Sequence, residues 1–190
     1  SNQHARELLV DVEEETKHYS AAICYVNEIL EYNPYQVGWW RRKINLYRKD
    51  GNNLEADRLL YRLKQIFPKE TQVQNDINYQ TELTLATQKK MGDTEGMIQS
   101  LKTLLRSDPN DPEKYLQLSN IYLQTGDTEA ALSTAAKGAR LTKSAVLAKK
   151  YAGILGEQGK YNEAIAYLKE MQRSANIGCL DQTIQYMEEN

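Results

Sequence analysis

The chain has 190 residues, of which 41% are hydrophobic, and this is enough to bury the core of one domain or slightly more. Its 24 basic and 26 acidic residues nearly cancel to a net charge of -2, so it lacks the strong positive field with which nucleic-acid-binding proteins attract phosphates. Nucleic acid is therefore not the expected partner.

No run approaches the roughly 18 consecutive apolar residues of a membrane-spanning helix, so we expect a soluble chain without membrane insertion. The two cysteines, Cys24 and Cys179, exclude a disulfide framework but leave one bridge or two free thiols open. Cys24 is interpreted as a packed thiol. The chain begins Ser1-Asn2 without methionine, which is typical of a scar left by tag removal, so we expect a piece of a longer protein and assign no compartment.

Glycines recur between helical patterns along the whole chain. Subtraction gives steps of 41, 34 and 33 residues between Gly51, Gly92, Gly126 and Gly159. A glycine permits the positive φ that ends one helix in a tight turn. The spacing therefore predicts a helix-turn-helix unit that is repeated.

Two further columns follow the same period. A mostly small residue comes five positions after each turn glycine and at the matching place of an earlier copy: Ala22, Ala56, Met97, Ala131 and Ala164. Alanine lets two antiparallel helices approach closely. A proline that stops the second helix ends the first three copies, at Pro34, Pro68 and Pro109.

Two copies show the pattern clearly, although the fourth lacks the proline. The second reads Trp40, Ile44, Tyr47, Gly51, Ala56, Leu60, Leu63 and Pro68. The fourth reads Tyr115, Leu118, Ser119, Tyr122, Gly126, Ala131, Ala135 and Gly138. These residues resemble the tetratricopeptide repeat (TPR) family, whose repeat of about 34 residues carries such a pattern.

The resemblance implies an all-α, right-handed α-α superhelix (solenoid) of about five TPR helix-turn-helix repeats plus a C-terminal helix. We expect a single TPR solenoid domain over residues 1–190 and no strands. The step of 41 adds about two helical turns to the third repeat, so its first helix is expected over 71–90. The repeats are expected at 3–36, 37–70, 71–111, 112–144 and 145–177, with the last helix at 178–190.

Two repeats depart from the pattern. The first has Lys17 where the turn glycine is expected. The third has Gln88 in place of the tyrosine and Met97 in place of the alanine. We interpret these two repeats as degenerate.

The sequence offers no set of groups that is typical of catalysis. Its only histidines, His4 and His18, lack a His-Glu-x-x-His arrangement, and no glycine-rich phosphate loop follows a strand. We expect no enzyme, no catalytic residue, no cofactor and no metal. The glutamates at 13–15 point in different directions on a helix and predict a solvated face.

The resemblance implies that the first helices line a concave groove that takes an extended peptide or a helix. In the second repeat the stripe Trp40, Ile44 and Tyr47 is expected to face inward. The stripe one residue later then faces the groove. This offset predicts partner-binding residues at Arg41, Asn45, Arg48, Leu116, Asn120, Leu123, Gln124 and Lys149.

The same offset places Glu7 and Glu14 in the groove of the first repeat. Residues 34 apart occupy equivalent positions, so Glu7 is predicted to face Arg41 and Glu14 to face Arg48. Some TPR proteins clamp a carboxylate with paired basic residues and asparagines. Glu113 and Gln117 replace basic residues that such a clamp needs, so the clamp is not expected.

The function predicted from the sequence is a non-catalytic scaffold that binds a peptide or protein segment of unknown identity in the concave groove. Two alternatives stay open: an RNA-processing helical-repeat protein, and a regulatory TPR domain of a larger enzyme. The aromatic and basic run Trp39-Trp40-Arg41-Arg42 favours RNA only weakly, because the repeat register assigns Trp40 to the core.

Overall fold

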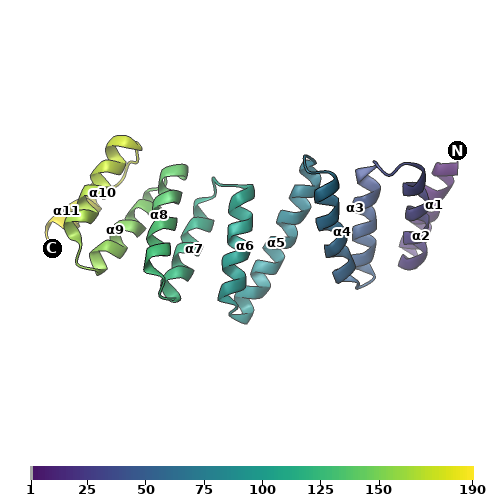
Figure 1. Ribbon diagram of the computed structural model, residues 1–190, viewed down its shortest axis with the longest axis horizontal. Helices are drawn as coiled ribbons and strands as arrows, with labels where there is room; N and C mark the ends of the chain where they lie inside the picture. The colour runs from purple at the N-terminus through teal and green to yellow at the C-terminus, as the bar shows by residue number, and fades with distance from the viewer. Residues whose placement is uncertain (1) are drawn as a thin grey trace. The chain divides into compact units, whose positions relative to one another are not determined.

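The computed structural model describes residues 2–190, which form eleven helices and no strand (Figure 1). They form five pairs and a terminal helix, so the predicted all-α class and repeat count are confirmed. The long first helix of the third repeat is confirmed as α5. In order they are α1 (Asn2–Glu15), α2 (Tyr19–Tyr32), α3 (Val37–Lys49), α4 (Asn53–Ile66), α5 (Thr71–Met91), α6 (Thr94–Ser107), α7 (Pro112–Gln124), α8 (Thr128–Thr142), α9 (Ala145–Glu157), α10 (Tyr161–Ser174) and α11 (Asp181–Glu188).

The chain divides into two compact units, an N-terminal unit of residues 1–79 and a C-terminal unit of residues 80–190. The division falls within α5. Val73 and Ile77 of this helix pack into the core that α3 and α4 form, and Leu85 belongs to the core of the C-terminal unit. The single domain that the sequence suggests over residues 1–190 stays a prediction.

The turns have the backbone that the glycine spacing predicted. The four turn glycines have φ between +69° and +82°. Lys17 takes the same place in the first repeat with φ +64°. A side chain at such a φ approaches the following carbonyl oxygen, which costs about 1–2 kcal/mol. The first turn therefore forms without glycine, at a local cost.

Small residues allow the paired helices to approach closely. Ala56 and Ala131 are completely buried, as are the other two alanines of their column. At Gly138 of α8, a Cβ atom would lie only 2.5 Å from Cγ of Tyr115 on α7. The buried Ser119 also joins these two helices, because its hydroxyl donates a hydrogen bond of 2.9 Å to the carbonyl of Ala131.

The third repeat replaces part of this packing with a polar contact. Gln88 of α5 stands at the tyrosine position of the pattern. Its Oε1 atom accepts a hydrogen bond of 2.8 Å from the hydroxyl of Ser100 on α6. This contact gives the degenerate repeat a link between its two helices.

Both cysteines are free and exposed. The prediction of a packed Cys24 was wrong. Ala22 and Ile23 of α2 are buried, and Cys24 lies about 200° further round the helix than Ala22, on the solvent side. Within residues 2–190, no helix combines the length and the apolar character that crossing a bilayer requires.

Candidate interaction surfaces

Ion pairs join α1 and α3 in the N-terminal unit. Nη2 of Arg42 lies 2.7 Å from Oε2 of Glu14 and also pairs with Asp11. Nζ of Lys49 lies 2.7 Å from the other oxygen of Glu14. The Glu14 side chain is only 18% exposed. The prediction that residues 13–15 form a solvated face was therefore wrong for Glu14, which connects the two helices.

Arg41 and Arg48 have partners other than the predicted ones. Arg41 donates bonds of 2.6 and 3.0 Å to the two carboxylate oxygens of Asp76 on α5. Arg48 lies 3.0 Å from Asp57 on α4. The predicted pairs of Arg41 with Glu7 and of Arg48 with Glu14 were wrong.

The error has a geometric reason. Residues 34 apart are equivalent, so their side chains leave neighbouring helices in similar directions rather than toward each other. The next residue lies 100° further round the helix. On α3 this rotation brings Arg42 to the α1 side, while Arg41 reaches α5.

The electrostatics of the Glu14 cluster favour the charged forms. Burial raises the pKa of Glu14, but the bonds from Lys49 and Arg42 and their charges lower it more, so it lies below its ordinary value of 4.5. Burial lowers the pKa of Arg42, and the bonds to Glu14 and Asp11 raise it more. Glu14 and Arg42 therefore hold their charged forms more strongly than the free side chains do.

The predicted stripe of the second repeat lines one open pocket of about 500 Å³. Arg41, Asn45 and Arg48 share it with Arg42 and with three other residues of α1 and α3. Each of its four cations makes an ion pair. Asn45 is exposed, and within residues 2–190 no hydrogen bond engages its amide. Asn45 is thus the polar group of this pocket that is available to a partner.

The predicted stripes of the fourth and fifth repeats lie in the C-terminal unit. Leu116 is partly buried and packs against the core of this unit, so it is less open than a groove position would be. Asn120 and Leu123 are half-buried, whereas Gln124 and Lys149 are exposed. The role of these residues in binding stays a prediction.

Part of α9 is covered by the terminal helix. Gly156 belongs to the same stripe as Lys149 and is buried. A Cβ atom at Gly156 would lie 3.3 Å from the terminal methyl carbon of Met187 on α11. The helix α11 therefore caps the last pair and covers the C-terminal end of the α9 stripe.

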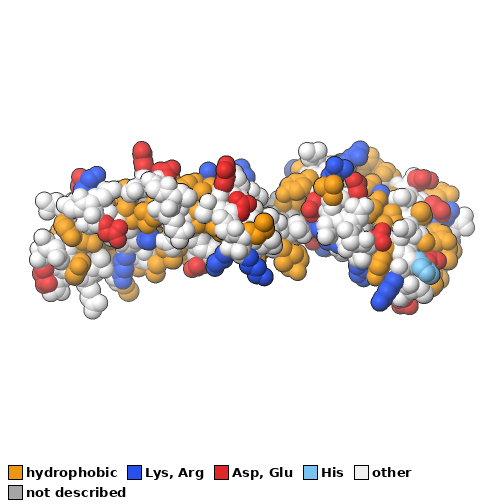
Figure 2. Space-filling model, turned by 90° about the horizontal axis from the view of Figure 1, so that it is seen from below, with side chains coloured by type: hydrophobic (Ala, Val, Ile, Leu, Met, Phe, Trp, Pro, Cys, Tyr) orange, Lys and Arg blue, Asp and Glu red, His pale blue; other side chains and the backbone are white. Residues whose placement is uncertain are grey.

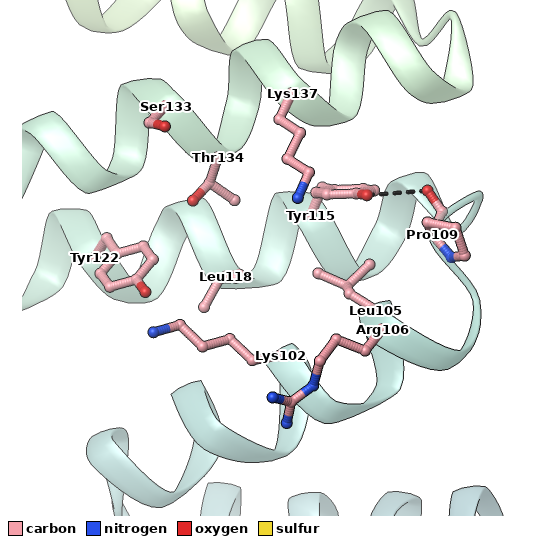
Figure 3. Close-up of a pocket in the computed structure, with 10 residues that line it drawn as sticks. All are labelled: Lys102, Leu105, Arg106, Pro109, Tyr115, Leu118, Tyr122, Ser133, Thr134 and Lys137. Atoms are coloured by element: carbon pink, nitrogen blue, oxygen red, sulfur yellow. Dashed lines mark hydrogen bonds between the residues drawn. The ribbon is translucent and has the colours of Figure 1, made fainter. Parts of the chain in front are cut away.

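A second pocket, of about 480 Å³, lies among α6, α7 and α8 (Figure 3). Its floor is formed by Leu105, Tyr115 and Leu118, which are all buried. The groove predicted from the sequence lies on the first helices alone and therefore does not include this pocket. Three basic side chains are part of its lining, and they are the signal that the sequence contains: Lys102, Arg106 and Lys137.

The tryptophan pair is used in packing. Trp39 and Trp40 are both half-buried against the core of the N-terminal unit. Trp40 Nε1 donates a hydrogen bond of 2.7 Å to the carbonyl of Pro34, and the Arg42 guanidinium lies 5.4 Å from the Trp39 ring centre. The feature that favoured RNA binding therefore has a structural explanation.

Charges of both signs are present on the face of the molecule that Figure 2 shows. On the face drawn in Figure 2, basic, acidic and apolar side chains are intermingled. Among residues 2–190, no three His, Cys, Asp or Glu side chains come together in a group that could hold a metal ion.

A family model described as tetratricopeptide repeat matches residues 113–144, which contain most of α7 and all of α8. A comparison with curated proteins finds no match. Three solved structures are similar at low identity. MamA has 14% identity and a TM-score of 0.42, with 95% of this chain and 94% of that chain covered. TTC0263, a thermophilic TPR protein in Thermus thermophilus, has 17% identity and a TM-score of 0.40, with 98% of this chain and 97% of that chain covered. The P58(IPK) TPR domain has 10% identity and a TM-score of 0.47, with 100% of this chain and 65% of that chain covered.

Proposed function

Because the chain is a tetratricopeptide repeat protein, with one repeat matched at residues 113–144, we propose that it is a non-catalytic scaffold for another protein. It binds an extended peptide segment of that partner along its first helices. In the N-terminal unit the segment lies in the pocket that contains Asn45.

The position of Asn45 is the observation that carries this proposal. Its amide can donate and accept hydrogen bonds at the same time, which matches the backbone amides of an extended peptide. The cations around it are already neutralised by Glu14, Asp57 and Asp76. They fix the shape of the pocket, while Asn45 is available for contacts with the peptide.

The test is a selection of random short peptides against the whole chain, followed by fluorescence polarisation of the selected peptides. Asn45→Ala should weaken binding about five- to ten-fold, because each lost hydrogen bond contributes about 0.5–1.5 kcal/mol. The control is Gln65→Ala, an exposed position on the second helix α4. An empty selection, or equal binding by both variants, would argue against this site.

The first helices of the C-terminal unit are tested with a double variant, Asn120→Ala with Leu123→Glu. It removes an amide and places a charge where we propose that a partner's apolar side chain lies. Peptides that bind this unit should lose affinity while the helicity measured by circular dichroism is unchanged. Unchanged binding by the folded double variant would move the site away from α7.

A further inference from the structure

The pocket among α6, α7 and α8 has basic side chains on both sides of an apolar floor (Figure 3). Lys102 and Arg106 extend from α6, and Lys137 extends from α8 on the opposite side. Tyr115 and Leu118 of α7 lie between them, and the Tyr115 hydroxyl donates a hydrogen bond of 3.0 Å to the carbonyl of Pro109. The floor is therefore held in place without the basic side chains.

Among residues 2–190, no carboxylate forms an ion pair with these three cations. The residues that line the pocket include no Asp or Glu. Within residues 2–190, the ion pairs involve none of the three, although other basic residues have close partners. Lys102 lies 5.9 Å from the Tyr122 ring centre, and Arg106 donates a hydrogen bond of 3.1 Å to Thr103.

The next groove of the same unit shows a different arrangement. Lys102 and Arg106 stand 10 and 14 residues after Gly92, and Lys137 stands 11 after Gly126, by subtraction. In the groove between α8 and α10 the same positions hold Ala136, Arg140 and Glu170. There Glu170 pairs with Arg173. This bond lowers the pKa of Glu170, and the charge of Arg140 also contributes to that lowering.

The equivalent groove of the N-terminal unit is mixed as well. The residues 10 and 14 positions after Lys17 are Asn27 and Glu31, and the residue 11 positions after Gly51 is Arg62. Among these three sets of positions, only the set on α6 and α8 holds cations alone. A single sign of charge beside an apolar floor is unfavourable without a counter-charge, and a ligand of opposite charge would supply it.

We propose that this pocket binds an acidic protein segment in which carboxylate side chains flank an apolar residue. The carboxylates pair with Lys102, Arg106 and Lys137, and the apolar side chain lies on Leu105 and Leu118. The hydroxyls of Ser133 and Thr134 line the same pocket and can donate to a carboxylate. Asn45, Asn120 and Leu123 are not part of this lining, so the two proposed sites can fail independently.

The test is a nuclear magnetic resonance titration of the whole chain with a terminally blocked Glu-Leu-Glu peptide. Saturable shifts are expected at the backbone amides of Lys102, Tyr122, Thr134 and Lys137. The matched Gln-Leu-Gln peptide has the same apolar residue without charge and should produce no shift. Shifts confined to Asn45 or Asn120 would overturn this proposal and leave the proposed function standing.

Substitutions test whether the three basic side chains are responsible for binding the peptide. The triple variant Lys102→Gln, Arg106→Gln, Lys137→Gln should weaken Glu-Leu-Glu binding at least ten-fold, because each exposed pair contributes up to about five-fold. A control with the same loss of charge is Lys69→Gln, Lys89→Gln, Lys90→Gln. Equal weakening in both variants would overturn the proposal, as would inorganic phosphate shifting the pocket amides as strongly as the peptide does.

Discussion

The two pockets differ in how they use positive charge. In the N-terminal unit, Arg42 and Lys49 pair with Glu14, and Arg41 pairs with Asp76. In the C-terminal unit, the basic residues of the pocket between α6 and α8 have no such partner among the described residues. The basic residues of the two pockets therefore have different roles. The role depends on whether a neighbouring helix supplies a carboxylate partner. Paired cations fix the helices, and unpaired cations attract a ligand.

The largest expected effect concerns the floor of the C-terminal pocket. Gly138→Ala should lower the free energy of unfolding by about 1–3 kcal/mol, because the new methyl group would overlap the root of the Tyr115 side chain. Urea denaturation followed by circular dichroism measures the loss. Gly153→Ala is the control, since apart from the adjacent residues and the backbone of its own helix no atom lies within 4 Å of its added Cβ. An equal effect of the two variants would show that the close approach of α7 and α8 is not needed.

A smaller loss is expected in the ion-pair cluster of the N-terminal unit. Glu14→Gln should cost about 1 kcal/mol at neutral pH, because it leaves Arg42 and Lys49 facing each other without a counter-charge. Both tryptophans, Trp39 and Trp40, lie on α3, so their fluorescence reports this unit.

The pH dependence of the same variant gives a second readout. The pKa of folded Glu14 is lowered, so its contribution is complete above the ordinary value of 4.5 and is lost as the pH falls through the lowered pKa. The wild type should therefore lose its advantage over Glu14→Gln below about pH 4.5. A difference that stays constant down to acid pH would contradict the charged role of Glu14.

The smallest effect is a gain in stability at the first turn. Lys17→Gly should raise the free energy of unfolding by about 0.5–1 kcal/mol, because glycine adopts the observed φ of +64° without strain. Lys17→Ala keeps the strain and should give no gain. Tryptophan fluorescence during urea denaturation compares the two. A gain from alanine alone would show that the lysine side chain, rather than its backbone, limits this turn.

The sequence was sufficient to predict the helix pairs and their turns. Gly126 and Ala131 have roles that depend only on local backbone geometry and on close approach, and both recur with the period. The partner of a long charged side chain is different, because it depends on rotation about the helix axis. Arg41 and Arg42 are adjacent in sequence but reach α5 and α1, and the period alone could not separate them.

The candidate sites were predictable to different degrees. The stripe of Arg41, Asn45 and Arg48 does line one pocket, because all three residues lie on one helix. Lys102 and Lys137 are 35 residues apart in the sequence, by subtraction. They line the same pocket from two different second helices, α6 and α8. A rule that considers first helices alone cannot find them. Leu116 was assigned to the groove, although it is partly buried against the core of its unit.

A comparison of two double variants tests whether paired cations are structural and unpaired cations are not. Urea denaturation is followed by tryptophan fluorescence and circular dichroism for Arg41→Gln with Arg42→Gln, and for Lys102→Gln with Lys137→Gln. The first variant should lose about 1–2 kcal/mol of unfolding free energy, because it leaves Asp76 and Glu14 without their arginine partners. The second should stay within about 0.5 kcal/mol of the wild type. Equal losses, or a larger loss in the second variant, would contradict the division of roles between the two pockets.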